Sequence, residues 1–113
     1  MLINDLNISD GVITSIQSNQ SNVKIMITDW QGIQWEITFN EVLAIQAFSI
    51  EDIDLSHVSE VSDDSLKLKV LRLYKDEEPH RFTCFNFHVV WIEEPLLKII
   101  ATQDYTFFRI SES

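Results

Sequence analysis

The chain has 113 residues, of which 45% are hydrophobic and 11% aromatic, with a net charge of −10. This apolar content excludes an intrinsically disordered protein, and the length is typical of one domain that spans residues 1–113. The negative charge disfavours nucleic acids as partners because it repels their phosphates. No apolar run approaches the roughly 20 residues that a membrane span needs, so we expect no membrane contact.

The cysteine content and the first residues favour a cytoplasmic protein. Cys84 is the only cysteine, so an internal disulfide is excluded, as is usual in a reducing compartment. The first six residues lack the basic start and the apolar stretch of a signal peptide.

Residues 23–39 contain two alternating segments around a turn. Hydrophobic residues occupy every second position over 23–27 and again over 33–39, and the sequence Asp29-Trp30-Gln31-Gly32 separates them. Period-two alternation on both sides of a glycine-containing turn predicts a β-hairpin with one buried face. Another strand is predicted before it, over residues 12–18, with a polar turn at 19–22.

The segment after the hairpin fits more than one structure. Residues 40–48 suit either a short helix or a strand buried on both faces, and we favour the strand because its neighbours are strands. Ser49, followed by Glu51 and Asp52, predicts a short helical turn over 50–57. Residues 58–65 are then expected to form an exposed loop.

The second half of the chain also alternates. Residues 66–70 predict a strand with a β-bulge before Leu73, and a turn follows over 76–80. Residues 81–92 form the longest predicted strand, and two more are expected over 97–101 and 105–110. The aromatic residues expected in the core are Trp35, Phe39, Phe85, Phe87 and Trp91.

These elements predict an all-β, mainly antiparallel domain of seven or eight strands, with at most one or two short helical turns. So many half-buried strands are covered either in a two-layer sandwich or in a partly open barrel. The sequence does not choose between these two architectures.

Residues capable of catalysis or metal binding lack a recognised spacing. Cys84, Asn86 and His88 share one strand face and are the residue types of a cysteine-protease triad. In a strand, however, the Cα atoms of Cys84 and His88 lie about 13 Å apart, too far for a nucleophile and its base. His57 and His80 also lack the paired spacing of metal ligands. We therefore expect no catalytic site, metal or cofactor.

The acidic residues are concentrated in one segment. Residues 41–64 contain seven acids and no lysine or arginine, whereas residues 65–113 are electrically balanced. The segment is either a solvated loop or a binding surface for a basic partner, and Trp30 is either an exposed anchor or folded back. The residues predicted to contact a partner are Trp30, Glu51, Asp52, Asp54, Glu60, Asp63 and Asp64.

About half of the chain resembles small bacterial all-β proteins, some of which are classed as toxin-immunity proteins. The similarity rests on the 23–39 hairpin and on three patterns: Asp10-Gly11-Val12-Ile13-x-x-Ile16, Phe39-x-x-Val42 and Leu97-x-Ile99-x-Ala101. Members often have a histidine before the first aspartate, where this chain has Ser9. The resemblance implies a non-enzymatic protein that acts by binding a partner.

Three functions are compatible with these patterns. The first is a cytoplasmic, immunity-like module that binds a basic protein through its acidic residues. The second is a small-molecule-binding domain or enzyme with a pocket in a barrel interior, where Asn86 and His88 would supply polar groups. The third is a structural homo-oligomer, such as a homodimer, that pairs strand edges or apolar faces.

Overall fold

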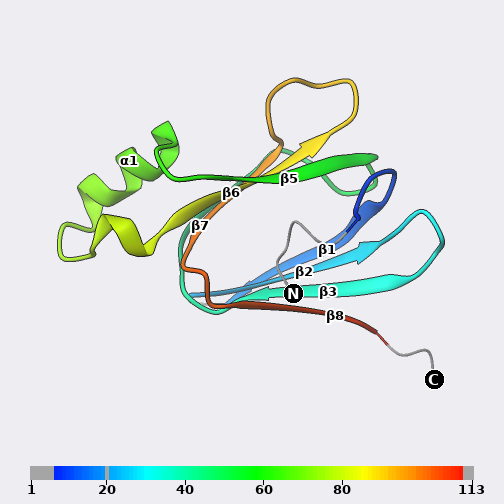
Figure 1. Ribbon diagram of the computed structural model, residues 1–113, viewed down its shortest axis with the longest axis horizontal. Coiled ribbons are helices and arrows are strands. Elements are labelled where there is room, and N and C mark those ends of the chain that lie inside the picture. Colours follow the sequence, from blue (N-terminus) through cyan, green and yellow to red (C-terminus); the bar gives the residue numbers. More distant parts are fainter. Residues whose placement is uncertain (1–6, 20, 111–113) are drawn as a thin grey trace.

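The computed structural model describes residues 7–19 and 21–110, and its strands form two sheets that lie face to face (Figure 1). One sheet has the order β1-β2-β3-β8 and the other β4-β7-β6-β5, and all neighbouring strands are antiparallel. The sheets do not close into a barrel, so of the two expected architectures the chain adopts the sandwich. The elements are β1 (Val12–Asn19), β2 (Asn22–Thr28), β3 (Gln34–Phe39), β4 (Val42–Ala47), β5 (Leu55–Val61), α1 (Ser65–Leu73), the 3₁₀ turn η2 (Pro79–Arg81), β6 (Thr83–Val89), β7 (Leu97–Ala101) and β8 (Tyr105–Arg109).

The predicted hairpin is confirmed as β2 and β3, which pair from Val23 opposite Phe39 to Thr28 opposite Gln34. The Asp29 side chain closes the turn, because its Oδ1 atom accepts hydrogen bonds from the backbone N–H groups of Gln31 and Ile33. Gly32 has a φ of 83°, a conformation that glycine adopts without a steric penalty. The turn thereby fixes the register of both strands.

Residues 42–47 form strand β4, as favoured from the sequence, and the strands expected near 12–18, 97–101 and 105–110 are also present. The longest predicted strand, 81–92, is shorter in the structure. Its first residue belongs to η2, β6 covers Thr83–Val89, and the chain then turns. Trp91 therefore lies outside the strand.

The predicted helical turn over 50–57 and loop over 58–65 are wrong, because Leu55–Val61 is strand β5. A register shift between Leu55 and His57 explains the error. After this bulge Val58 lies opposite Phe87 and packs against the core, so inward residues are not spaced by two along the strand. The irregular spacing hides the strand from a search for strict alternation.

The strand predicted over 66–70 is also wrong, because residues 65–73 form the helix α1. Asp64 is its N-cap, and its Oδ1 atom accepts a hydrogen bond of 2.8 Å from the N–H of Leu66. The helix buries Val70 on the outer face of the second sheet, against Cys84 and Ile100. Alternating Leu and Lys residues fit this helix because both are strong helix formers.

The main core lies between the sheets and is centred on three aromatic rings. The Phe39 ring centroid lies 4.9 Å from that of Phe85, and the Tyr105 centroid lies 5.6 and 5.5 Å from these two. Phe87 is also fully buried, while Trp35 is half-buried and donates its indole N–H to Asp29 (3.0 Å). Four of the five aromatic residues expected in the core thus lie in it or at its edge.

Trp91 contradicts the expectation, since 99% of it is exposed. The prediction extended the alternation of Phe85, Phe87 and Val89 by two residues, but β6 ends at Val89. Trp91 lies in the following turn with a φ of 71°, which directs the chain away from the sheet.

Gly11 holds the start of β1 against the other sheet and against the hairpin turn. Its backbone N–H donates a hydrogen bond to the carbonyl of Ile8, and its carbonyl accepts one from the N–H of Leu55, the first residue of β5. A Cβ atom at position 11 would lie 2.8 Å from the Thr28 carbonyl oxygen and 3.2 Å from the Cα of Asp29. Both neighbours are backbone atoms, so there is no flexible side chain to move aside.

We therefore expect Gly11→Ala to lower the free energy of unfolding by roughly 2 kcal/mol, the range of other overpacked sites. Urea denaturation monitored by tryptophan fluorescence measures the change. Gly32→Ala is the comparison, because no atom lies within 4 Å of a Cβ there and only the positive φ opposes it. Its expected cost is about 1 kcal/mol. Equal stability of the Gly11→Ala protein and the wild type would contradict this packing.

Candidate functional site

One end of the sandwich is built from the loops that join strands of both sheets. We call the loop end the four segments 7–11, 29–33, 48–54 and 90–96. Backbone hydrogen bonds connect three of these segments: Leu55 N–H donates to Gly11, Asp52 N–H to Ile13, and Val90 N–H to Asp54. The fourth segment, 29–33, lies against Gly11, whose Cβ position is 3.2 Å from the Cα of Asp29. In Figure 1 this end lies opposite α1, and the β6–β7 loop projects from it.

The loop end contains acidic residues and no lysine or arginine. None of its acids takes part in an ion pair within the described residues. Burial alone would raise the pKa of Asp29, but hydrogen bonds from Trp35, Ile33 and Gln31 and the charge of Arg109 on β8 lower it overall. The acids of the loop end are Asp10, Asp29, Glu51, Asp52, Asp54, Glu93 and Glu94.

Large hydrophobic side chains are exposed among these acids. The exposed fractions are 62% for Trp30, 57% for Phe48, 99% for Trp91 and 44% for Ile92. Exposure of single hydrophobic residues is common on protein surfaces, but four at one end, two of them tryptophan, indicate an interaction surface.

The backbone is also strained in this region. Within the described residues, the non-glycine residues with positive φ are Asp10, Ser49, Asp52 and Trp91, and all lie in the loop end. Aspartate tolerates this conformation, but a bulky residue such as tryptophan rarely adopts it. Strain of this kind costs about 1–3 kcal/mol and is concentrated at functional sites. At Trp91 this backbone strain is not offset by side-chain burial, because the side chain is exposed.

Two hollows at the surface share Trp91, Ile92 and Glu93 in their linings. The first, of about 490 Å³, is lined on one side by His57 and His88 and on the other by Trp91 and Glu93. The second, of about 600 Å³, lies between Phe48 and the β6–β7 loop, and Trp91, Glu93 and Glu94 line it. A partner side chain therefore finds apolar contact and a carboxylate in each hollow.

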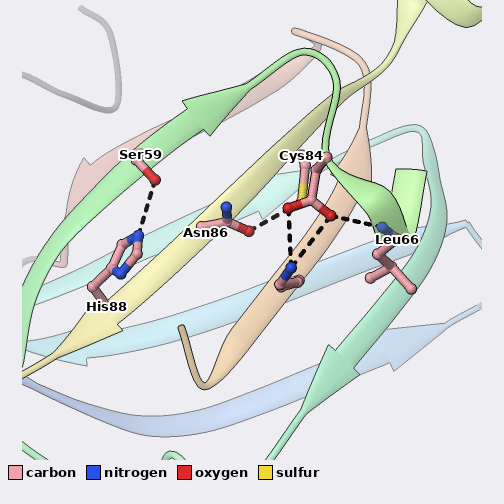
Figure 2. Close-up of polar contacts among 7 residues, drawn as sticks. Ser59, Leu66, Cys84, Asn86 and His88 are labelled. Atoms are coloured by element: carbon pink, nitrogen blue, oxygen red, sulfur yellow. Dashed lines mark hydrogen bonds and ion pairs between the residues drawn. The ribbon is translucent and has the colours of Figure 1, made fainter. Parts of the chain in front are cut away.

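His57 and His88 stack on each other at the edge of the first hollow. Their ring centroids are 4.4 Å apart and their planes differ by 9°. Ser56 Oγ hydrogen-bonds to Nδ1 of His57 (2.9 Å), and Ser59 Oγ to Nε2 of His88 (3.0 Å; Figure 2). A metal ion lies in the plane of each imidazole that binds it, so two parallel, facing rings do not converge on one ion. Across the described part of the chain, no three His, Cys, Asp or Glu residues group as metal ligands.

The pKa of His88 is lowered by burial and by the nearby His57 and Lys98. Its ordinary value of about 6.5 applies to the unfolded chain, which therefore binds more protons than the folded chain just below that pH. We expect the free energy of unfolding to fall as the pH is lowered from 7 towards 5. In His88→Gln this pH dependence is reduced, whereas the exposed His80→Gln control keeps it. Urea denaturation at pH 7, 6 and 5 measures the slope; identical slopes in all three proteins would contradict this assignment.

A polar row crosses the outer face of the second sheet beside the histidines. The strand register aligns Gln46, Lys98, Asn86 and Ser59 in one line from β4 to β5. Lys98 Nζ lies 3.0 Å from Oδ2 of Asp64, the residue that caps α1 (Figure 2). Burial alone would raise the pKa of Asp64, but hydrogen bonds from Lys98 and from the Leu66 N–H hold it below its usual range. This pair joins the helix to the sheet.

Cys84, Asn86 and His88 share the strand face that the sequence indicates, but they do not form a triad. The Cys84 thiol donates a hydrogen bond to Oδ1 of Asn86 (3.0 Å), and His88 is bonded to Ser59 instead (Figure 2). Burial, together with the Asp64 carboxylate, raises the pKa of Cys84 to about 12. The group is therefore a thiol at neutral pH and is not a nucleophile.

The structure divides the predicted partner-binding residues between two ends of the molecule. Trp30, at the exposed hairpin tip, and Glu51, Asp52 and Asp54 belong to the loop end. Glu60 lies near the far end of β5, and Asp63 and Asp64 follow that strand, whose seven residues span about 20 Å. There Glu60 accepts a hydrogen bond from Gln103, and Asp64 is the partner of Lys98.

The remaining loop-end residues come from distant parts of the sequence. Each of them lies just before or just after a strand: Asp10, Asp29 and the pair Glu93-Glu94. These residues come together only because the folded sandwich places those strand ends at the same end of the molecule. The sequence Trp91-Ile92-Glu93-Glu94 does combine exposed aromatic and acidic residues, and a predicted turn at this point is the one available signal.

Known proteins provide no family for this chain. No family model, curated protein or solved structure matches it. None of the helices in residues 7–19 and 21–110 is long and apolar enough to cross a membrane. The geometry of the loop end is therefore the basis for a functional assignment.

Proposed function

We propose that this chain is a cytoplasmic, non-enzymatic protein-binding module whose loop end docks onto a basic protein surface. The observation that carries the proposal is the combination, in the four loop-end segments, of four exposed hydrophobic side chains with seven acids and no lysine or arginine, although Arg109 of β8 lies near enough to Asp29 to lower its pKa. Inhibition of a cationic toxin by an immunity protein is one function of this type, and the family resemblance agrees with it.

The distribution of ion pairs supports the loop end over the opposite end. Near α1 and η2, three acids are compensated within the chain: Glu41 and Glu77 pair with Arg81, and Asp64 pairs with Lys98. The exposed Asp63 and Asp76 form no ion pair among the described residues, but lysines and arginines are close to them in sequence on and around α1. Charges already paired contribute little attraction to a partner. No loop-end carboxylate forms an ion pair with another described residue, so these carboxylates attract a basic partner and accelerate its association.

The side-chain types also match those of known protein interfaces. Tryptophan is enriched among the residues that dominate binding energy, and such residues lie inside a rim of polar groups. Trp30, Phe48, Trp91 and Ile92 provide the apolar contacts, and the seven acids provide the rim.

The sandwich offers less support for a small-molecule site in a barrel interior. The space between the sheets is occupied by buried side chains, including Phe39, Phe85 and Phe87. The hollows around Trp91 lie at the surface and are open to solvent, which suits contact with a protein.

Affinity capture with matched charge variants tests the proposal. Wild-type protein is immobilised and exposed to extract of its source organism at low salt, and captured proteins are identified and purified. Asp52→Asn combined with Glu94→Gln removes two loop-end charges, and asparagine tolerates the positive φ at position 52. Asp63→Asn combined with Asp76→Asn removes two exposed charges near α1.

We expect a basic partner that is released at high salt and that binds the loop-end variant about tenfold more weakly, since each exposed charge contributes up to about 1 kcal/mol. The α1-end variant should bind like the wild type. Equal weakening by the two variants, or no specific capture by the wild type at low salt, would contradict the proposal.

A further inference from the structure

The hollow between the stacked histidines and Trp91 has a composition that selects one kind of side chain. We call it the Trp91 hollow; its lining is Ser56, His57, His88, Val89, Val90, Trp91, Ile92 and Glu93. We propose that this hollow binds an arginine side chain of the basic partner, an inference that rests on the proposed function.

Trp91 provides an aromatic surface that is free to stack. The residue is almost completely exposed, so neighbouring side chains do not cover its ring. A guanidinium group is planar and weakly hydrated, and it stacks on tryptophan more favourably than an ammonium group does. Trp91 lies in the turn that follows the last residue of β6.

Glu93 provides the charge that arginine requires. Its carboxylate lines the same hollow and forms no ion pair within the described residues. A carboxylate accepts two parallel hydrogen bonds from one guanidinium group, whereas lysine interacts as a point charge. Stacking on Trp91 and pairing with Glu93 are compatible because the guanidinium donors lie in the plane of the group.

The histidine pair also lines the hollow. In its neutral form each imidazole has one nitrogen that accepts a hydrogen bond. Nε2 of His57 has no hydrogen-bond partner in the described part of the chain, and it accepts a hydrogen bond in the tautomer in which Nδ1–H donates to Ser56. Burial, His57 and Lys98 lower the pKa of His88 and favour its neutral form at pH 7.

Lys98 is the base closest to these groups in the sheet register, on the strand next to His88. Its charge is compensated by Asp64, 3.0 Å away. The acids near the hollow, Glu93 and Asp54, retain their charge without a partner among the described residues. The local field therefore favours a cation.

Two capped tripeptides of equal charge, tri-arginine and tri-lysine, are suitable probes. Isotope-labelled protein is titrated with each at pH 7 and low salt, and chemical shifts of the Trp91 indole N–H and of the backbone around 56–57 and 90–93 are followed by NMR. Tri-arginine is expected to bind at least about fivefold more tightly than tri-lysine, because stacking and bidentate pairing each add to the charge attraction.

Glu93 and Glu94 supply a matched pair of variants. Both are exposed neighbours in one turn, but Glu93 lines the Trp91 hollow and Glu94 lines only the hollow beside Phe48. We expect Glu93→Gln and Trp91→Leu to abolish the preference for arginine, and Glu94→Gln to keep it. Unchanged strand chemical shifts in each variant verify the fold.

Three outcomes overturn the inference: equal affinity for the two peptides, loss of the arginine preference in Glu94→Gln as strongly as in Glu93→Gln, or absence of binding by either peptide. If both peptides bind equally to the loop end, with shifts spread over its acids, a basic partner still fits and only the arginine site fails. If the arginine preference maps to the Trp91 hollow but no basic protein is captured, the proposed function fails and the side-chain site stands.

Discussion

Replacing Asp64 with alanine is expected to lower the free energy of unfolding by roughly 3 kcal/mol, although the residue lies in a short connection between β5 and α1. The change removes the N-cap of α1, which contributes about 1 kcal/mol, and leaves Lys98 without its counterion on the sheet surface. The Lys98 side chain is only 19% exposed, so water does not fully compensate the loss. Urea denaturation measures the effect.

Two further variants separate the contributions. Asparagine caps helices as well as aspartate does, so Asp64→Asn removes the charge and keeps the cap. Adding Lys98→Met to Asp64→Asn also removes the uncompensated charge, and should restore part of the stability. The exposed neighbour Asp63→Ala is expected to change the free energy of unfolding by less than about 0.5 kcal/mol.

The pH dependence of this pair has a defined sign. Since the pKa of Asp64 is lower in the folded chain than in the unfolded chain, its contribution is complete above about pH 4 and disappears as the pH falls through the folded value. The difference between wild type and Asp64→Asn should therefore shrink in acid. A difference that is constant from pH 7 to pH 3, or a near-neutral Asp64→Ala, would show that the Lys98 pair does not stabilise α1.

The fold class could be predicted because most of the strands are half-buried and follow strict period-two alternation. The hairpin is the clearest case: Val23, Ile25 and Ile27 are buried on β2, and the turn between the strands contains the expected glycine. The choice between sandwich and barrel depends on which strand edges pair across the chain. Contacts of this kind, such as β3 with β8, join residues far apart in sequence and leave no local pattern.

The helix α1 shows how a local pattern misleads when two periods fit it. Leu66, Leu68 and Val70 alternate with lysines, but Leu66 and Val70 also stand four residues apart, on one helix face. The residue types decide between them, because Leu and Lys favour helices and Asp64 is a strong N-cap. With the helix in place, Leu68 is exposed while Leu66 and Val70 pack on the sheet.

The candidate site was only partly predictable for the same reason. Trp30 and the acids at 51–54 could be found from the sequence, because a turn residue between strands lies at the surface. The acids at 60–64 were grouped with them by sequence proximity, but the intervening strand β5 carries them to the far end. Trp91 was misplaced because alternation does not indicate where a strand ends.

Substitutions of Trp91 are expected to weaken partner binding strongly while leaving the free energy of unfolding almost unchanged. Replacing it with serine should weaken binding of the basic partner by about 30- to 100-fold, the effect of removing a central tryptophan anchor worth 2 kcal/mol or more. The free energy of unfolding should stay within about 0.5 kcal/mol of the wild type, because the exposed ring buries no surface on folding.

Trp91→Gly extends the same argument to the backbone. Glycine adopts a φ of 71° without strain, which offsets its greater flexibility in the unfolded chain, so stability should be unchanged or raised by up to about 1 kcal/mol. Binding should be as weak as in Trp91→Ser. Most substitutions destabilise a protein, so a variant that loses binding without losing stability identifies a residue retained for contact with a partner.

Leu73→Ser is the matched control, since Leu73 is 75% exposed on α1 at the opposite end of the sandwich. It should leave partner affinity unchanged. Affinities measured by calorimetry with the purified partner, beside urea denaturation of each variant, give both quantities for the same proteins. If Trp91→Gly unfolds the chain or binds the partner normally, the strained turn has a structural role and the contact surface must lie elsewhere.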